Sequence, residues 1–359
     1  MLRRCLDSTC LTFIWRKIFC LAILQSKYED VLKIISNKEK EYNFFSIPKK
    51  DGYRKIGYLK DESFLKIYQN RLIDNFFSHY PIPVVVKGFV KDENYFSFLK
   101  EHIGSNYFLR IDIKDFFDSI KFEHFNNFML EMASFQNKDD DIDKIIKLIW
   151  DIISYNNSLV QGTTSSPMIS NLIFRRIDQR ILKYCQELQI KYTRYADDLF
   201  FSSQSFDFQN KKWFLKKINH ILKENDFKIN YSKLKCCNKQ ISFNGFVVSN
   251  KNIRLSRKRF KDINQMIWFI NRNISSIKKE SDFFEQLHKI NFTNITKYEK
   301  ISSYYKLLQF LCGYRSFLIG CIKEYEMSNK TKNRISKLLK KVDKCISVII
   351  NKHYPTYSS

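Results

Sequence analysis

Residues 192–201 read Tyr192-Thr193-Arg194-Tyr195-Ala196-Asp197-Asp198-Leu199-Phe200-Phe201. Apolar, β-prone residues flank two adjacent acids, a pattern that predicts two strands joined at Ala196-Asp197-Asp198. Strand ends hold side chains on a rigid platform, so these acids would be placed with little freedom. An isolated Asp-Asp pair is more often a solvated turn, so its interpretation depends on what the rest of the chain supplies.

A third acid stands at the end of another predicted strand. Residues 107–113 read YFLRIDI, a short apolar run that contains Arg110 and Asp112. Two Mg²⁺ ions about 4 Å apart over a phosphate need carboxylates that bridge or flank both ions. Asp112 is therefore the candidate to complete the set with Asp197 and Asp198, and the carbonyl of Ile113 is a candidate additional ligand.

Two further segments carry polar residues in defined local structures. Residues 44–56 predict a β-hairpin that turns at Asp51-Gly52. Lys49, Lys50 and Arg54 crowd its tip, although a Lys-Lys pair by itself usually marks a solvated turn. Residues 161–167 read QGTTSSP and predict a polar loop that leads into a long amphipathic helix over about 168–188.

The remaining chain is mostly helical by its apolar spacing. Residues 1 to about 40 carry a helical pattern, and further helices are predicted over about 61–77, 122–132, 145–153 and 214–224. A strand is predicted over 229–235 and a hairpin over 241–255. From residue 257 onward the sequence is helical and rich in lysine.

The charge balance points to a polyanionic partner. Lys+Arg is 62 against Asp+Glu at 37, which gives a formal net charge of +25 and a pI near 9.5. Aromatic residues make up 16% of the chain and are interleaved with the lysines, which favours nucleic acid over a membrane surface. A compositional bias of an AT-rich genome would explain much of the same excess, so charge alone does not decide the function.

Cysteine placement and the N-terminal segment indicate a cytoplasmic protein. The nine cysteines include no CxxC pair, so a zinc ribbon is not expected. Their irregular placement indicates a reducing compartment. The apolar segment 10–24 is interrupted by Arg16 and Lys17, which makes it too short and too charged to span a bilayer. A buried or amphipathic helix is expected there in preference to a signal peptide.

Together these segments resemble the ordered motifs of reverse transcriptases. Tyr195-Ala196-Asp197-Asp198 looks like motif C, and Asp112-Ile113-Lys114-Asp115-Phe116-Phe117 resembles motif A. The QGTTSSP string is similar to motif B, residues 47–55 resemble the fingers hairpin, and Asn244-Gly245-Phe246 resembles the primer grip. The resemblance implies an α+β fold with right-hand polymerase architecture. It implies an N-terminal extension over 1–40, fingers and palm over 41–256, and a helical thumb over 257–359.

Roles follow from the resemblance for the matching residues. It implies that Asp112, Asp197 and Asp198 are the catalytic acids, and that two Mg²⁺ ions, or Mn²⁺, are the cofactor. Phe117 stands at the position of the steric gate against the ribose 2′-hydroxyl, where an ordinary core Phe is the alternative. The nucleotide-binding residues implied are Lys49, Lys50, Arg54, Gln161 and Gly162. Lys233 or Lys235 would be the general acid for pyrophosphate, and Asp115 and Asp118 are expected to be structural or solvated.

The resemblance implies an RNA-directed DNA polymerase, and two alternatives to its leading interpretation stay open. The TRYADDLFFSS string is similar to that of bacterial reverse transcriptases. Around His102 and around Asn244 the chain departs from the pattern of retron enzymes, which favours a role in antiphage defence. A retron enzyme that makes RNA-linked DNA is the first alternative, and an RNA-binding maturase or scaffold without polymerase activity is the second.

The partners implied are a non-coding RNA template, the DNA product and dNTPs. No membrane partner is expected, and a homo-oligomer or a separately encoded effector protein is a further expectation. Tyr354 or Tyr357 is a candidate protein primer. The lysine-rich cluster over 330–341 would contact RNA phosphates.

Overall fold

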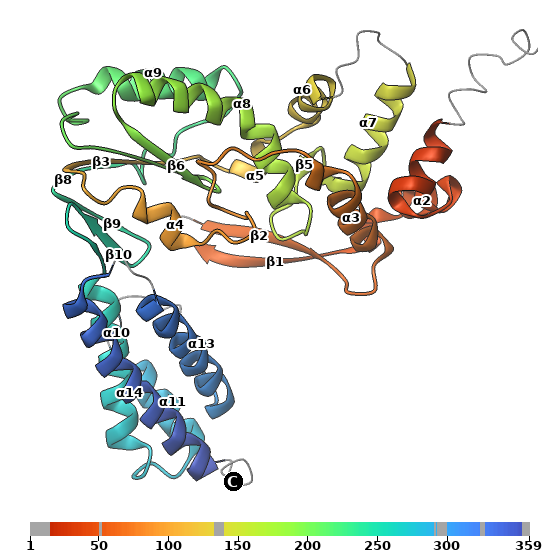
Figure 1. Ribbon diagram of the computed structural model, residues 1–359. Coiled ribbons are helices and arrows are strands. Elements are labelled where there is room, and N and C mark those ends of the chain that lie inside the picture. Colours follow the sequence, from red (N-terminus) through yellow and green to blue (C-terminus); the bar gives the residue numbers. More distant parts are fainter. Residues whose placement is uncertain are drawn as a thin grey trace, which may run out of the picture. The chain divides into compact units, whose positions relative to one another are not determined.

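The computed structural model describes residues 15–49, 52–132, 140–290, 292, 300–323 and 327–353. Helices and antiparallel sheets make up the fold, which is the predicted α+β class (Figure 1). By internal contacts the chain divides into two compact units: residues 1–98 with 109–236, and residues 99–108 with 237–359. The domain boundaries at residues 40 and 256 stay predictions.

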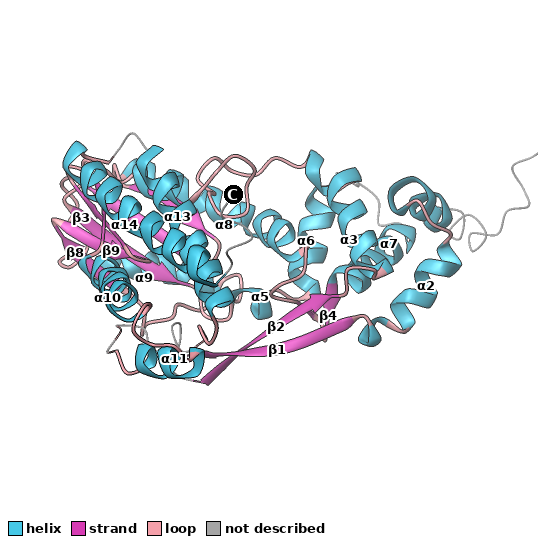
Figure 2. Cartoon of the chain, turned by 90° about the horizontal axis from the view of Figure 1, so that it is seen from below, coloured by secondary structure: helices cyan, strands magenta, loops and turns pink. Residues whose placement is uncertain are grey.

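The predicted hairpin is confirmed as a long two-stranded ribbon. β1 (Tyr42–Lys49) pairs antiparallel with β2 (Gly52–Leu59), and Lys49 lies opposite Gly52 (Figure 2). Gly52 has a φ of 110°, a conformation that a side chain would strain, so glycine suits the end of this ribbon. Lys50 and Asp51 lie outside the described residues.

A four-stranded sheet carries the acids in the first unit. Its order is β6 (Lys191–Tyr195), β7 (Asp198–Ser203), β3 (Tyr107–Asp112) and β8 (Lys235–Asn238). β6 and β7 form an antiparallel hairpin in which Tyr195 lies opposite Asp198, as the sequence predicts. Because strand side chains alternate, Phe201 contacts Phe214 on one face while Phe200 contacts Phe98 on the other.

Helices pack around this sheet and hairpin, and most follow the predicted spans. Ser63 caps the first turn of α3 by accepting a hydrogen bond from the Lys66 backbone N–H. The helix α8 contacts both α9 and β6 and is the longest helix of this unit (Figure 1). The helices are α2 (Tyr28–Ser36), α3 (Phe64–Asn75), α4 (Tyr95–Lys100), α5 (Phe116–Ser119), α6 (Phe122–Met132), α7 (Asp140–Ile153), α8 (Ser166–Glu187) and α9 (Lys212–Lys223).

The predicted strand over 229–235 is wrong. Only Ile229 makes a β-bridge, with Ile113, and residues 231–233 form a turn before β8 begins at Lys235. The backbone N–H of Asn230 donates to the Asp112 carbonyl at 2.8 Å, and that of Lys233 donates to the Asn230 carbonyl. Residues 231–233 form a turn and not a strand because these hydrogen bonds fold the chain back toward Asp112.

The second unit combines a small sheet with helices. The predicted hairpin over 241–255 is instead a three-stranded antiparallel sheet of β9 (Gln240–Phe243), β10 (Phe246–Ser249) and β11 (Ile253–Leu255). The helical pattern after residue 257 is confirmed by α10 (Arg257–Asn273), α11 (Glu280–His288), α13 (Tyr304–Lys323) and α14 (Asn329–His353). Ser256 caps α10 through the Arg259 backbone N–H.

The N-terminal segment and the cysteines behave largely as expected where they are described. Residues 15–24 are helical and end in a π-helical turn (Cys20–Leu24), with Trp15 and Leu21 exposed. Within the described ranges, no helix combines the length and apolarity needed to cross a membrane. Among the described cysteines, Cys20, Cys185, Cys321 and Cys345 are buried, and Cys312 is exposed.

Candidate active site

Asp112 and Asp197 open onto one cavity of about 270 Å³ in the first unit. The hairpin strand β2, the segment after β3, the loop before α8 and the turn before β8 all contribute to its wall. The lining residues are Tyr53, Arg54, Lys55, Asp112, Ile113, Asp115, Phe116, Phe117, Asp118, Gln161, Asp197, Asn230 and Lys233. Carboxylates, cationic side chains and an amide thus face the same space.

Asp112 is buried and held by the turn that follows α9. One carboxylate oxygen accepts from Asn230 Nδ2 at 3.0 Å and the other accepts from Lys233 Nζ at 2.9 Å. The Asp112 side chain is 3% exposed, whereas that of Lys233 is 46% exposed. The lysine therefore reaches the acid from the solvent side and has room to move away.

The turn between β6 and β7 presents the other two acids differently. Ala196 has a φ of 54°, and the Asp197 carbonyl accepts from the Ile113 N–H at 2.9 Å, which joins the two acid-bearing strand ends. Asp198 is buried and accepts from Arg110 Nε and Nη2 at 3.0 and 2.9 Å. Asp197 lines the cavity, and Asp198 is engaged by Arg110.

Burial and crowding shift the acids toward their neutral forms. Burial raises the pKa of Asp198 to about 7, with Asp197 adding to the rise and Arg110 opposing it. Burial, and then the neighbouring Asp112, also raise the pKa of Asp197. Like charges gathered in a poorly solvated place in this way are stabilised by a bound cation.

A buried ion pair lies under the turn and ties it to α8. Asp178 accepts from Arg194 Nε and Nη2 at 2.9 and 2.7 Å and from the Tyr192 hydroxyl at 2.7 Å. Both charged side chains are 0% exposed. Arg194 Nη1 donates to the Ala196 carbonyl at 3.0 Å and to Asn171 Oδ1 at 3.1 Å. A single guanidinium thus fixes the backbone of the acidic turn from below.

The same network includes the segment before α4. Asn171 Nδ2 donates to the Gly88 carbonyl at 2.9 Å, and the Lys87 N–H donates to the Arg194 carbonyl at 2.8 Å. A Cβ at Gly88 would lie 2.6 Å from the Ala196 backbone nitrogen. Only glycine lets this segment pass so close to the acidic turn.

The loop before α8 packs on the backbone of the hairpin. The Gly57 N–H donates to the Gln161 carbonyl at 2.9 Å. Gly162 has a φ of 113°, and a Cβ there would collide with the Gly57 carbonyl. Glycine at both positions lets hairpin and loop touch, which places the Gln161 and Arg54 side chains on the same cavity.

Adjacent phenylalanines after β3 have different surroundings. Phe116 is buried and packs on Phe174 and Phe227, with ring centroids 5.7 and 5.9 Å away. Phe117 is half-buried and neighbours Phe89 at 6.4 Å. Phe89 is itself 47% exposed and has a φ of 61°. The core position therefore belongs to Phe116, while Phe117 presents its ring at the cavity wall.

The other predicted site residues are distributed as follows. Lys49 ends β1, Lys50 lies outside the described residues, and Lys235 is exposed at the start of β8. Asn244, Gly245 and Phe246 lie in the second unit at the turn between β9 and β10, where Arg259 covers the Phe246 ring at 5.4 Å. The roles predicted for these residues stay predictions. Asp115 and Asp118 are exposed and line the cavity, and the expectation that they are structural or solvated stays a prediction.

The donor set fits a divalent cation by its chemistry. In the described ranges, no three His, Cys, Asp or Glu side chains are gathered closely enough to hold a metal as they stand. Asp112, Ile113 and Asp197 nevertheless line the same cavity. Carboxylate and carbonyl oxygens are the ligands that Mg²⁺ prefers, so these three residues would hold it, and Asp198 would join only by leaving Arg110.

Several residues of this site escaped the sequence analysis. Arg110 and Arg194 were visible as charges inside apolar strand runs, and Asp178 as an acid on the apolar face of α8, where Ile177 and Ile181 are also buried. A charge in such a position signals a buried partner. Which charges pair with one another could not be inferred, because the partners are separated by 16 and 88 residues.

Three comparisons with known proteins bear on this site. The family model described as reverse transcriptase (RNA-dependent DNA polymerase) matches residues 47–248. The chain is 28% identical over 255 residues to the retron Ec86 reverse transcriptase of Escherichia coli, covering 67% of this chain and 74% of that one. It is 33% identical over 198 residues to the retron Ec73 enzyme of the same organism, covering 53% and 61%. Apo telomerase from Candida tropicalis aligns with a TM-score of 0.46 at 14% identity, covering 88% of this chain and 58% of the telomerase.

Proposed function

The chain belongs to the reverse transcriptase family, and we propose that it is an RNA-directed DNA polymerase that adds dNTPs to a 3′ end on a non-coding RNA template. The single observation that carries the proposal is the shared cavity. Asp112 and Asp197 line it together with Arg54, Gln161 and Phe117. Acid, cation, amide and ring are the groups that nucleotidyl transfer requires in one place.

The hairpin and the loop before α8 would bind the incoming nucleotide. Arg54 and Lys55 line the cavity and would hold the triphosphate by charge-assisted hydrogen bonds, with Lys49 and Lys50 adding charge at the tip. Gln161 would contact the nucleotide, and Gly162 keeps the backbone close to the hairpin. Fixed cations there stabilise the negative charge that develops on the leaving pyrophosphate.

The carboxylates of Asp112, Asp197 and, after its release from Arg110, Asp198 would hold two Mg²⁺ ions, with the Ile113 carbonyl as a further ligand. When bound, the ions lower the pKa of the attacking 3′-hydroxyl and neutralise charge on the transferred phosphate. Lys233 has its ammonium on Asp112 in the structure. On its release from the acid, this ammonium would be free to donate a proton to the leaving group, and Lys235 is the alternative donor.

The central experiment is template–primer extension with Mg²⁺ and dNTPs. We expect Asp197→Asn to reduce the extension rate by a factor on the order of 10³, because the residue loses a charged metal ligand. Asp74→Asn, which neutralises an exposed acid on α3, is the matched control and should extend normally. If the wild-type protein with its copurified RNA incorporates nothing, the polymerase proposal fails and the maturase or scaffold alternative gains support.

Phe117 would act as the steric gate against the ribose 2′-hydroxyl. Phe117→Ala should admit ribonucleotides, whereas Phe117→Tyr keeps the ring and should keep the preference for dNTPs. The measurement is the ratio of kcat/KM for a dNTP and the matching NTP. An unchanged ratio in Phe117→Ala would remove the gate assignment.

We propose a role in bacterial antiphage defence, in the cytoplasm, with the retron setting as the alternative. The named relatives are retron enzymes, which supports a retron-like RNA partner. Sequencing the copurified RNA and any DNA attached to it separates the two. RNA-linked DNA copied from part of the same RNA supports the retron alternative. Loss of phage protection in Asp197→Asn would connect nucleotide transfer to defence.

Mass measurement of the purified complex tests for the expected homo-oligomer or effector protein. Intact-mass analysis tests for DNA attached to Tyr354 or Tyr357, the candidate protein primers, which lie outside the described residues.

A further inference from the structure

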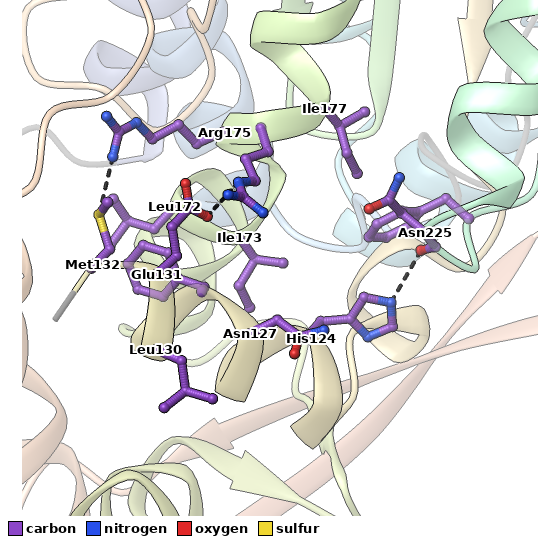
Figure 3. A pocket seen from close by; sticks show the side chains of 13 residues that line it. His124, Asn127, Leu130, Glu131, Met132, Leu172, Ile173, Arg175, Ile177 and Asn225 are labelled. Carbon is purple, nitrogen blue, oxygen red and sulfur yellow. Dashed lines mark hydrogen bonds and ion pairs between the residues drawn. The ribbon is translucent and has the colours of Figure 1, made fainter. Parts of the chain in front are cut away.

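Two pockets near α9 differ in how their charges are balanced. The first, of about 440 Å³, lies between α6 and α8 and has polar side chains that already have partners (Figure 3). Arg176 pairs with Glu131 at 2.7 Å, Arg175 donates to the Met132 sulfur, and both ring nitrogens of His124 are hydrogen-bonded to backbone groups. The contacts of Arg175 and Arg176 join α8 to α6, and the charged side chains of this pocket thus have partners within the protein.

The second pocket, here called the lysine pocket, is dominated by cations. It has a volume of about 700 Å³ and belongs to the first unit. Its lining residues are Lys114, Asn219, Lys223, Asp226, Phe227, Lys228, Ile229 and Tyr231. Three lysines thus face one acid. A pocket of this size accommodates a nucleotide.

The acids near the lysine pocket lie close to basic side chains other than its lysines. Glu224 pairs with Arg180 and with His220, the latter at 3.1 Å. Asp226 lies 3.8 Å from His124 Nε2. In the part of the chain that the structure describes, no carboxylate forms an ion pair with Lys114, Lys223 or Lys228. The three ammonium groups are therefore left for an external anion.

The backbone holds these lysines in a fixed arrangement. The Lys114 N–H donates to the Lys228 carbonyl at 2.8 Å, beside the bridge between Ile113 and Ile229. Lys223 ends α9, and its carbonyl accepts from the Asp226 N–H. These bonds hold the backbones of lysines from separate parts of the chain beside one pocket, whereas a solvated helix face would draw its lysines from a single helix.

Tyr231 adds a surface for a planar group. It is 60% exposed and lines the lysine pocket. The residue before it, Asn230, lines the catalytic cavity and is hydrogen-bonded to Asp112. Exposed rings among ammonium groups are the arrangement that binds single-stranded nucleic acid, since phosphates meet the cations while a base stacks on the ring.

We propose that the lysine pocket binds an unpaired RNA segment, with its phosphates on Lys114, Lys223 and Lys228 and a base on Tyr231. The inference rests on the proposed RNA-directed activity, since the RNA meant is the part of the template molecule outside the catalytic cavity. None of these four residues lines that cavity. The site would therefore add affinity for the RNA partner without taking part in nucleotide transfer.

The test measures binding of a labelled single-stranded RNA of about 12 nucleotides, a length chosen to exceed one binding site, to the full chain. Lys223→Glu with Lys228→Glu should weaken binding at least about tenfold and lower the slope of log affinity against log salt by roughly one unit for each phosphate that is no longer bound. Lys212→Glu with Lys217→Glu is the charge-matched control, because both lysines are exposed on α9 and do not line the pocket. Equal reductions in affinity in the two double variants would overturn the proposal.

The ring is tested separately from the charge. Tyr231→Ala should weaken RNA binding about fivefold or more, and Tyr231→Phe should bind like the wild type, because stacking needs the ring and not the hydroxyl. A Tyr231→Ala variant that binds RNA normally would overturn the stacking interaction. A DNA oligonucleotide of the same sequence should show the same dependence on these residues, since the protein would bind it through phosphates and ring faces.

A second measurement separates this proposal from the proposed function. Extension of a short template–primer without unpaired RNA should proceed at the wild-type rate in Lys223→Glu with Lys228→Glu. If this variant fails to extend while the control double variant extends, the lysines act in catalysis and the proposal is overturned. If the wild-type protein also fails to extend, the proposed function fails, while lysine-dependent RNA binding is still measured on its own.

Discussion

The acidic turn at Asp197 and Asp198 and the strand end at Asp112 carry the same chemistry but are held in opposite ways. Under the turn lies Arg194 paired with Asp178, both fully buried. Asp112 is held by Asn230 and by Lys233, whose side chain is 46% exposed. The acidic turn is thus held by a buried ion pair, whereas Asp112 is held in part by a solvent-exposed lysine that another cation could replace. This contrast indicates that the buried pair fixes the turn, whereas we expect a bound cation to compete with Lys233 for Asp112.

The largest expected effect comes from breaking the buried pair. Asp178→Asn leaves Arg194 charged without its counter-ion, which should lower the free energy of unfolding by about 3–5 kcal/mol. Denaturant unfolding measures this decrease. A stability within experimental error of the wild type would show that the pair does not hold the turn.

A double variant sharpens the same point. Asp178→Leu with Arg194→Met replaces the pair by apolar side chains of similar size and should recover much of the stability. It should not recover polymerase activity, because the hydrogen bond from Arg194 to the Ala196 carbonyl is gone. Recovery of both stability and extension would assign the pair a purely structural role.

Gly88→Ala should disturb the turn from the outside. Its Cβ would lie 2.6 Å from the Ala196 nitrogen, so the two segments must separate, at a cost of about 1–3 kcal/mol in unfolding free energy. Extension by the folded variant should fall because the acids move with the turn. Gly313→Ala on α13, where a Cβ meets nothing within 4 Å, is the control and should extend normally.

The smallest expected effect on stability concerns Lys233. Lys233→Met removes a half-exposed partner of the buried Asp112, which keeps its hydrogen bond from Asn230, and should lower the free energy of unfolding by about 1–2 kcal/mol. It should also raise the apparent affinity for Mg²⁺, measured by thermal shift, since the ammonium no longer occupies Asp112. Lys235→Met, an exposed lysine two residues away, is the matched control. Equal Mg²⁺ shifts in both variants would contradict the competition.

The sequence predicted those parts of the site whose interactions join residues close together in the chain. The hairpin, the strand ending at Asp112 and the turn at Asp197 were predicted because each depends on residues adjacent in the chain. The turn at 231–233 was not, because its apolar and lysine-containing sequence resembles a strand and only the Asp112 carbonyl and carboxylate fold it back.

The sequence alone predicts which residues carry the chemistry of this protein. The two acids at Asp197 and Asp198, a third acid at another strand end, and a glutamine before a helix specify reaction and family through their order. The tertiary structure decided how they are used: Asp197 faces the cavity while Asp198 faces Arg110, and Phe117 lines the wall beside a Phe116 that is buried in the core. The physical reason is that burial and charge pairing join residues far apart in the chain, and no local pattern encodes which of them meet.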